Sequence, residues 1–108
     1  MNTSMAERRT QPRITACDLV MVGWHDGIGK LNQLGNVEDL SLGGMGILVY
    51  DDLPVGTPVT VTYGYGELGG IVRHSSTRDH GNFIGIEFDE SSRNSMLHFQ
   101  PELLIRDL

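Results

Sequence analysis

Two short segments carry most of the residues whose types and spacing could bind a ligand. The first is Arg9-Thr-Gln-Pro-Arg13, which with the preceding Arg8 places three of the eight basic residues within six positions. An arginine guanidinium is a rigid fork of donors that fits a phosphate or the O6/N7 edge of guanine, and its plane can stack on a base. We interpret this segment as a binding element for an anionic ligand that contains guanine.

The second segment, Asp39-Leu-Ser-Leu-Gly-Gly44, supplies complementary groups. A carboxylate only accepts hydrogen bonds, so among the bases Asp39 suits the N1–H and N2–H₂ edge of guanine, which adenine lacks. Ser41 can donate to a phosphate oxygen, and Gly43 and Gly44 leave space where the backbone turns or lies close to a ligand. The alternative is an ordinary turn in which Asp39 or Ser41 caps its own backbone. The two segments together favour a nucleotide site.

Arg-x-x-x-Arg followed some tens of residues later by Asp/Asn-x-Ser-x-x-Gly resembles the signature of the PilZ domain family, and no position of it is missing here. The resemblance implies a receptor for cyclic di-GMP rather than an enzyme. It implies that Arg9 and Arg13 hold guanine and phosphate, that Asp39 and Ser41 fix a guanine edge and a phosphate, and that Gly44 allows close approach.

The same resemblance assigns two further arginines to the site. In this family the residue before the first signature arginine is thought to influence whether one nucleotide or a stacked pair is held. Arg8 is a long cation at that position, so we expect two cyclic di-GMP molecules per chain. Arg73 ends a strand that the family places near the ligand, and it either adds a phosphate or guanine contact or is a solvated strand end.

Length and charge limit the class of protein. A chain of 108 residues suffices for one modest core, so we expect a single domain without a second, catalytic one. The net charge is −6, and residues 1–13 carry three arginines against Glu7, which leaves −8 on the remainder. An acidic body argues against a nucleic-acid binder and favours a small dianionic ligand.

Cys17 is the only cysteine, and the N-terminus has no secretory pattern, so we expect a cytoplasmic protein without a disulfide. No run approaches the roughly 18 apolar residues of a spanning helix, so no direct membrane insertion is expected. The oligomeric state stays open.

Turn residues and hydrophobic alternation predict an all-β fold. Residues 1–13 are predicted to be a flexible N-terminal arm, and residues 14–108 a six-stranded antiparallel β-barrel with a short C-terminal helix. The resemblance implies the same PilZ-type barrel, with the helix over its mouth. The predicted strands, in chain order, are Ile14–Val22, Leu31–Leu40, Gly46–Tyr50, Pro58–Tyr65, Leu68–His74 and Asn82–Phe88. The helix is predicted over Arg93–Gln100, ending at Pro101, and alternation predicts core positions at Val59, Val61, Tyr63, Ile84, Ile86 and Phe88.

Three patterns that resemble other sites are interpreted as structural. Gly64-x-Gly66-x-x-Gly69 matches a dinucleotide-binding pattern, but a strand follows it rather than a helix, so it predicts a hairpin turn. The four histidines lie on separate predicted elements, so no metal site is expected. Cys17 lies in a predicted strand, where a lone cysteine is typical of a small core residue. We therefore predict no catalytic residues and no cofactor.

These observations lead to the hypothesis of a cyclic di-GMP receptor whose N-terminal arm changes conformation on binding and which signals through an effector protein. One alternative is a pilus or motility adaptor with the same barrel that works by protein contacts without nucleotide. A remote alternative is an enzyme acting on a guanine nucleotide, for which Asp39 alone could supply chemistry.

Overall fold

The structure is a computed structural model that describes residues 14–41, 43–64, 66–96 and 103–106, so the predicted arm at 1–13 lies outside the described residues. Its elements are β1 (Ile14–His25), β2 (Lys30–Leu40), β3 (Gly44–Val49), β4 (Pro58–Tyr63), β5 (Gly66–Arg78), β6 (Gly81–Phe88), α2 (Glu90–Met96) and β7 (Leu103–Arg106).

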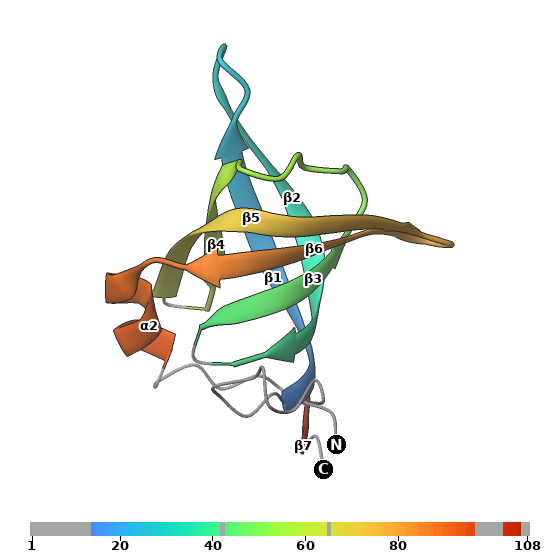
Figure 1. Ribbon diagram of the computed structural model, residues 1–108, viewed down its shortest axis with the longest axis vertical. Helices are drawn as coiled ribbons and strands as arrows, with labels where there is room; N and C mark the ends of the chain where they lie inside the picture. Colours follow the sequence, from blue (N-terminus) through green and yellow to red (C-terminus); the bar gives the residue numbers. More distant parts are fainter. Residues whose placement is uncertain (1–13, 42, 65, 97–102, 107–108) are drawn as a thin grey trace, which may run out of the picture.

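The predicted six-stranded antiparallel barrel is confirmed (Figure 1). The strands follow one another in the order β2-β3-β6-β5-β4-β1, and pairing of β1 with β2 closes the sheet on itself. Every ladder is antiparallel. Closure gives each barrel strand two neighbouring strands, so no barrel strand is an edge strand along its whole length.

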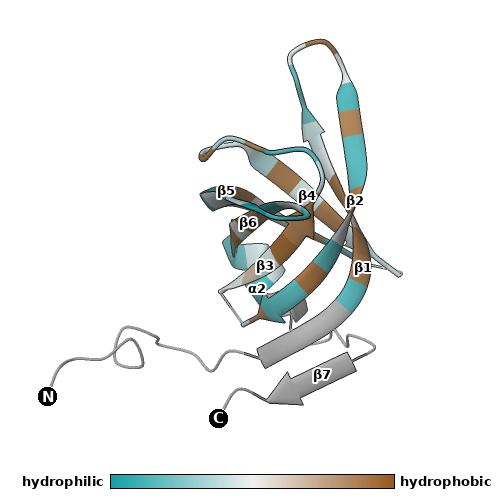
Figure 2. Ribbon diagram, turned by 90° about the vertical axis from the view of Figure 1, so that its right-hand side faces the viewer, coloured by the Kyte–Doolittle hydropathy of each residue, from teal (hydrophilic) through white to brown (hydrophobic). Residues whose placement is uncertain are grey.

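One face of each strand fills the barrel. Hydrophobic and hydrophilic residues alternate along the strands (Figure 2), as a half-buried sheet requires. Five of the six predicted core residues are buried, and Tyr63 packs against the core while partly exposed. The side chains with less than 2% exposure are Phe88, Ile47, Leu68, Ile84, Val22, Val37, Val61 and Val72.

Two hairpins extend further than predicted. β1 continues past Val22 to His25 and pairs with β2 out to Lys30, beyond the last β1–β4 pair at Gly23. β5 continues past His74 to Arg78. Both extensions project from the barrel in Figure 1. The end of the β1–β2 hairpin is a two-stranded ribbon held by cross-strand pairing, whereas β6 in the β5–β6 extension also pairs with β3, out to Val49↔Asn82.

The glycine pattern at residues 64–69 lies at a hairpin, as predicted, because β4 pairs antiparallel with β5 from Tyr63↔Gly66 onward. Gly64 has a φ of 45°, in the left-handed region that a tight turn uses. β7 is an additional strand that was not predicted. It pairs with the first four residues of β1, and a four-residue strand is too short to show periodicity in sequence.

The helix begins three residues earlier than predicted, at Glu90 instead of Arg93. Asp89 is its N-cap, because its Oδ1 accepts the backbone N–H of Ser92 at 2.8 Å. Residues 97–100 of the predicted helix lie outside the described part of the chain. No helix among the described residues has the length and apolar character needed to cross a membrane.

Candidate ligand-binding site

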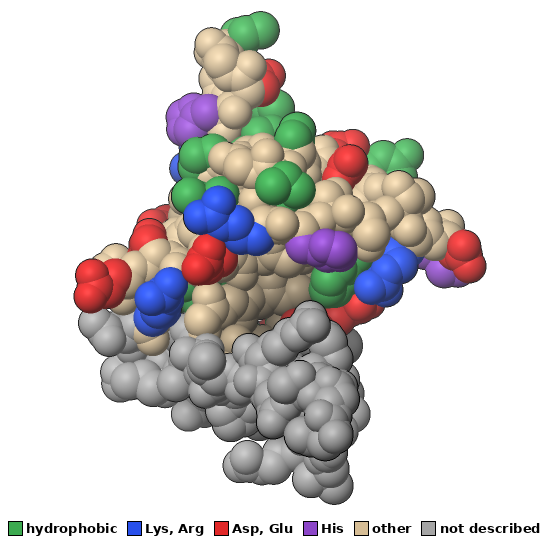
Figure 3. Space-filling view, in the orientation of Figure 1, with side chains coloured by type: hydrophobic (Ala, Val, Ile, Leu, Met, Phe, Trp, Pro, Cys, Tyr) green, Lys and Arg blue, Asp and Glu red, His purple; other side chains and the backbone are tan. Residues whose placement is uncertain are grey.

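The outer surface of β3 and β6 has a floor without side chains. Gly46 pairs with Gly85 across the two strands, and Gly44 follows one row away, opposite Glu87. β2 adds Asp39 directly opposite Gly46. Figure 3 shows this face as a stretch of tan surface bordered by basic, acidic and histidine side chains.

A hollow of about 570 Å³ lies over this floor. The residues that line it come from β2, β3, β5, β6 and the β2–β3 turn, and they are Asp39, Ser41, Gly43, Gly44, Met45, Gly46, Arg73, His74, Phe83, Gly85, Ile86 and Glu87. All five predicted site residues that the structure describes belong to this set. Arg8, Arg9 and Arg13 lie outside the described residues.

Two irregularities in strand register turn the polar residues outward. The β2–β3 register shifts between Val37 and Asp39, and the β5–β6 register shifts between Val72 and His74. Val37 and Val72 are fully buried, so a regular strand would direct the second residue after each of them inward as well. The extra residue of a β-bulge changes this alternation. Asp39 and His74 therefore both line the outer hollow.

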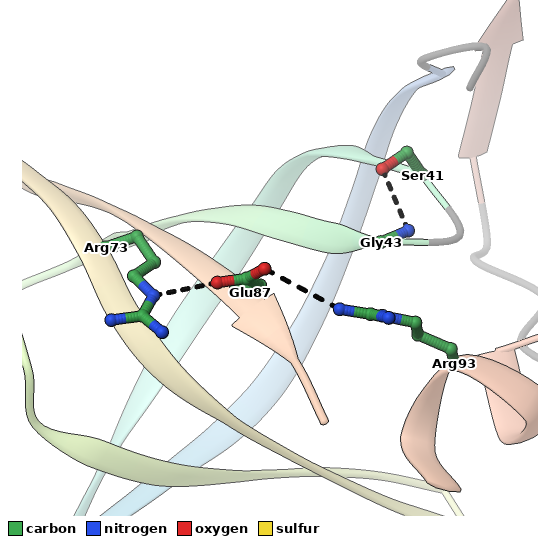
Figure 4. Close-up of polar contacts among 5 residues, drawn as sticks. All are labelled: Ser41, Gly43, Arg73, Glu87 and Arg93. Atoms are coloured by element: carbon green, nitrogen blue, oxygen red, sulfur yellow. Dashed lines mark hydrogen bonds and ion pairs between the residues drawn. The ribbon is translucent and has the colours of Figure 1, made fainter. Parts of the chain in front are cut away.

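The segment after Asp39 is a turn with internal hydrogen bonds. The backbone N–H of Ser41 donates to the carbonyl of Gly44 at 2.9 Å, and the N–H of Gly43 donates to Ser41 Oγ at 3.3 Å (Figure 4). Ser41 Oγ thus accepts from the backbone, which leaves its hydroxyl hydrogen to donate elsewhere. The turn and the binding interpretation of this segment are compatible.

The three floor positions differ in how strongly the surrounding structure requires glycine. A Cβ on Gly44 would collide with the carbonyl oxygen of Ile86, so strand packing already requires glycine there. A Cβ on Gly46 would lie 2.8 Å from Asp39 Oδ1 and 2.5 Å from Phe83 Cζ. A Cβ on Gly85 would meet only the Cβ of His74, at 3.3 Å. Gly85 is therefore the floor position at which the fold tolerates a side chain best.

Arg73 stands on the rim of the hollow in an ion-pair chain (Figure 4). Its Nε donates to Glu87 Oε1 at 2.8 Å, and Glu87 Oε2 lies 3.6 Å from an Nη of Arg93 on α2. The hydrogen bond from Arg73 and the charges of both arginines lower the pKa of Glu87, which is therefore ionised at neutral pH. A second hollow, of about 410 Å³, lies on the other side of Arg73 and Glu87, towards Arg93.

The lining residues that the sequence prediction did not include are Met45, Gly46, His74, Phe83, Gly85, Ile86 and Glu87. The alternation Ile84-Gly-Ile-Glu-Phe88 already placed Gly85 and Glu87 on the outer face, which was the available signal. No group of three or more metal-ligating side chains occurs within the described residues.

The chain belongs to the PilZ domain family, whose sequence profile matches residues 7–102. A search of curated proteins found no significant match. Among solved structures, the chain is similar to the PilZ domain with c-di-GMP of YcgR from Escherichia coli, with a TM-score of 0.61 and 18% identity over 83% of this chain and 86% of that one.

Two longer structures have the same fold over part of their length. They are YcgR from Escherichia coli in complex with c-di-GMP (TM-score 0.60, 21% identity, 85% of this chain and 44% of that chain) and the MrkH–c-di-GMP complex of K. pneumonia (TM-score 0.58, 20% identity, 84% and 51%). The chain spans about half the length of these two proteins.

Proposed function

We propose that this protein is a receptor for cyclic di-GMP and not an enzyme. The observation that carries the proposal is the hollow in which Asp39, Ser41 and Arg73 come together over a glycine floor, on the outer face of a PilZ barrel. The ligand named for the similar YcgR and MrkH structures supports the same class of ligand.

The lining residues that were predicted from the sequence have separate roles in this proposal. Asp39 accepts from the N1–H and N2–H₂ edge of a guanine, and the Ser41 hydroxyl donates to a phosphate oxygen. The backbone of the glycine floor allows the flat base to approach closely. Arg73 exchanges its exposed contact with Glu87 for a contact with the ligand, since exposed ion pairs of this kind contribute little stability.

The signature arginines complete the site from the N-terminal side. Ile14, the residue after Arg13, pairs with Leu40, and Thr15 pairs with Asp39. The chain therefore enters β1 beside the Asp39 segment. We place Arg9 and Arg13 on the ligand's guanine and phosphate groups, with residues 1–13 acting as an arm that changes conformation on binding.

Ligand binding then alters the surface of the protein, and an effector protein that contacts this surface receives the signal. The proposed receptor does not act by catalysis. Arg8 favours two nucleotides per chain, since a pair carries more phosphate charge to neutralise. The proposal places the receptor in the bacterial cytoplasm, in motility or biofilm regulation, and it includes neither nucleic acid nor membrane insertion.

Calorimetric titration with cyclic di-GMP, cyclic di-AMP and GTP in parallel tests this proposal. We expect saturable binding of cyclic di-GMP only, with two molecules per chain and no linear product after hours of incubation. Absence of binding heat at high micromolar cyclic di-GMP would contradict the receptor hypothesis. It would favour the alternative of an adaptor that works by protein contacts without nucleotide. Formation of linear dinucleotide or GMP would instead indicate the enzyme.

Arg8→Leu tests the stoichiometry separately. At protein concentrations far above the dissociation constant, we expect this variant to bind fewer molecules per chain than the parent without losing binding. A stoichiometry of one cyclic di-GMP molecule per chain in the parent would contradict the binding of two molecules.

A further inference from the structure

Phe83 lies next to the carboxylate that the proposed site uses to select a base. It is an outward residue of β6 and lines the hollow. Its Cζ lies 2.5 Å, and Asp39 Oδ1 2.8 Å, from the same point above Gly46, where a Cβ would stand. The tip of the ring and the carboxylate therefore both lie over Gly46, in the space that a Cβ would occupy.

The ring is held in place from the other side. The guanidinium carbon of Arg78 lies 4.5 Å from the ring centroid, which is a cation–π arrangement. An Nη of Arg78 also lies 3.7 Å from Glu38 Oε1 on β2. The rings of His74 and Phe83 form a T-shaped pair, with the centroids 6.2 Å apart. These contacts join β2, β5 and β6 around a ring that stands outside the barrel core.

We propose that Phe83 is a base-contacting residue of the site. The ring tip of Phe83 lies over Gly46 beside Asp39, so a guanine whose polar edge is bonded to Asp39 meets the aromatic ring of Phe83 next to that edge. Arg78 is a positioning residue that holds the ring. This inference rests on the proposed function, because it assumes a guanine at Asp39.

The experiment compares cyclic di-GMP affinity in the parent, Phe83→Leu and Phe83→Tyr. Leucine keeps an apolar side chain but removes the aromatic face, so we expect the dissociation constant to rise about five- to tenfold. Tyrosine keeps the ring, so its constant should stay within about twofold of the parent value. Equal affinity of parent and Phe83→Leu would overturn the inference, whereas absence of binding by the parent would overturn the proposed function.

Nuclear Overhauser contacts in the parent protein test the same point without a substitution. The chain has three phenylalanines, so the Phe83 ring protons are readily assigned. We expect contacts between these protons and the guanine N1–H and N2–H₂ protons of bound cyclic di-GMP, which face Asp39 in the proposed site. Their absence at saturating ligand, with contacts elsewhere in the hollow, would overturn the inference.

A double-mutant cycle tests the role of Arg78. Arg78→Ala should weaken binding about two- to threefold in the parent and have no further effect in Phe83→Leu, because its action passes through the ring. An undiminished effect in Phe83→Leu would mean that Arg78 attracts the ligand directly by charge, and its positioning role would be wrong.

Discussion

In the proposed site the identity of the base depends on Asp39, which lies on the outer face because of the bulge at Glu38. A carboxylate offers acceptors only, so it matches the donor edge of guanine and opposes the acceptor N1 of adenine. The neighbouring glycines have no side chains and therefore leave space for a ligand. Residue-scale chemistry and backbone space are therefore both part of the site.

Asp39→Ala should reduce cyclic di-GMP affinity about ten- to a hundredfold, because a guanine edge loses a charged acceptor. The same change should narrow the preference over cyclic di-AMP. Calorimetry measures both. Asp51→Ala is the matched control, since Asp51 is exposed and its hydrogen bonds with Gln33 use backbone atoms. Unchanged affinity in Asp39→Ala would remove this residue from the site.

Gly44→Ala and Gly85→Ala should have opposite consequences. A methyl group at Gly44 collides with the backbone of β6, so this variant should melt well below the parent. A methyl group at Gly85 requires only a small shift of His74, so its melting temperature should stay close to the parent value. It nevertheless occupies the floor of the hollow, so cyclic di-GMP affinity should fall. Parent-like affinity in a folded Gly85→Ala variant would show that the ligand does not use this floor.

At the scale of elements, α2 is attached to the barrel through Gly69 of β5. The N–H of Gly69 donates to Ser92 Oγ at 2.7 Å, and its carbonyl accepts from the N–H of Asp89 at 3.0 Å. The start of α2 thus continues the hydrogen bonding where β6 ends at Phe88. The Arg73–Glu87–Arg93 chain connects the same helix to the rim of the hollow.

Asp89→Ala should lower the free energy of unfolding by about 1 kcal/mol, the usual cost of losing an N-cap. Hydrogen bonds from the side chain and backbone of Ser92 hold the pKa of Asp89 below its usual 3.8. A lowered carboxyl pKa contributes stability above the unfolded-state value, and that contribution is lost as the pH falls through the folded-state value.

Chemical denaturation across pH measures this effect. The difference between parent and Asp89→Ala should be constant near neutral pH and shrink below about pH 3.8. A difference that grows towards low pH would have the wrong sign and would contradict the cap.

Glu87→Gln should increase cyclic di-GMP affinity. It removes a negative charge from the rim and leaves only a neutral amide oxygen to compete with the ligand for Arg73, while keeping the shape of the side chain. The melting temperature should change little, because both ion pairs of Glu87 are solvent-exposed. Glu67→Gln on β5 is the control, and a loss of affinity specific to Glu87→Gln would mean that Glu87 orients Arg73 for binding.

In the proposed receptor, the whole molecule consists of a barrel and an N-terminal arm whose arginines supply positive charge to the ligand site. The described barrel has its own buried core, so its stability should not depend on the arginines of residues 1–13. Ligand binding should therefore be the step that couples the two parts.

Arg9→Ala and Arg13→Ala should leave the melting temperature without ligand nearly unchanged and remove most of the stabilisation that saturating cyclic di-GMP gives the parent. Each should cost about ten- to a hundredfold in affinity, as expected for a charge-assisted contact. Amide exchange over residues 5–14 should be fast without ligand and slow on binding. Strong protection before any ligand is added would contradict the proposed arm movement.

Local sequence patterns were sufficient to predict the barrel and the residue types of the candidate site. Alternation along β4 and β6 identified their buried faces because a period of two is a local property of a strand. The segments around Arg9 and Asp39 were recognisable as a pair because their motifs depend on residue types at short spacing. The strand alternation and the two motifs could be recognised without knowing which strands are neighbours.

The tertiary structure alone decided which side chains share the hollow. The bulge at Arg73 directs His74 outward although alternation from Val72 directs it inward, and only the pairing of β5 with β6 reveals this. Phe83 meets Asp39 because β2, β3 and β6 are in register around the closed barrel. Register depends on the closure of the whole sheet, so contacts between residues far apart in the chain cannot be obtained from local periodicity.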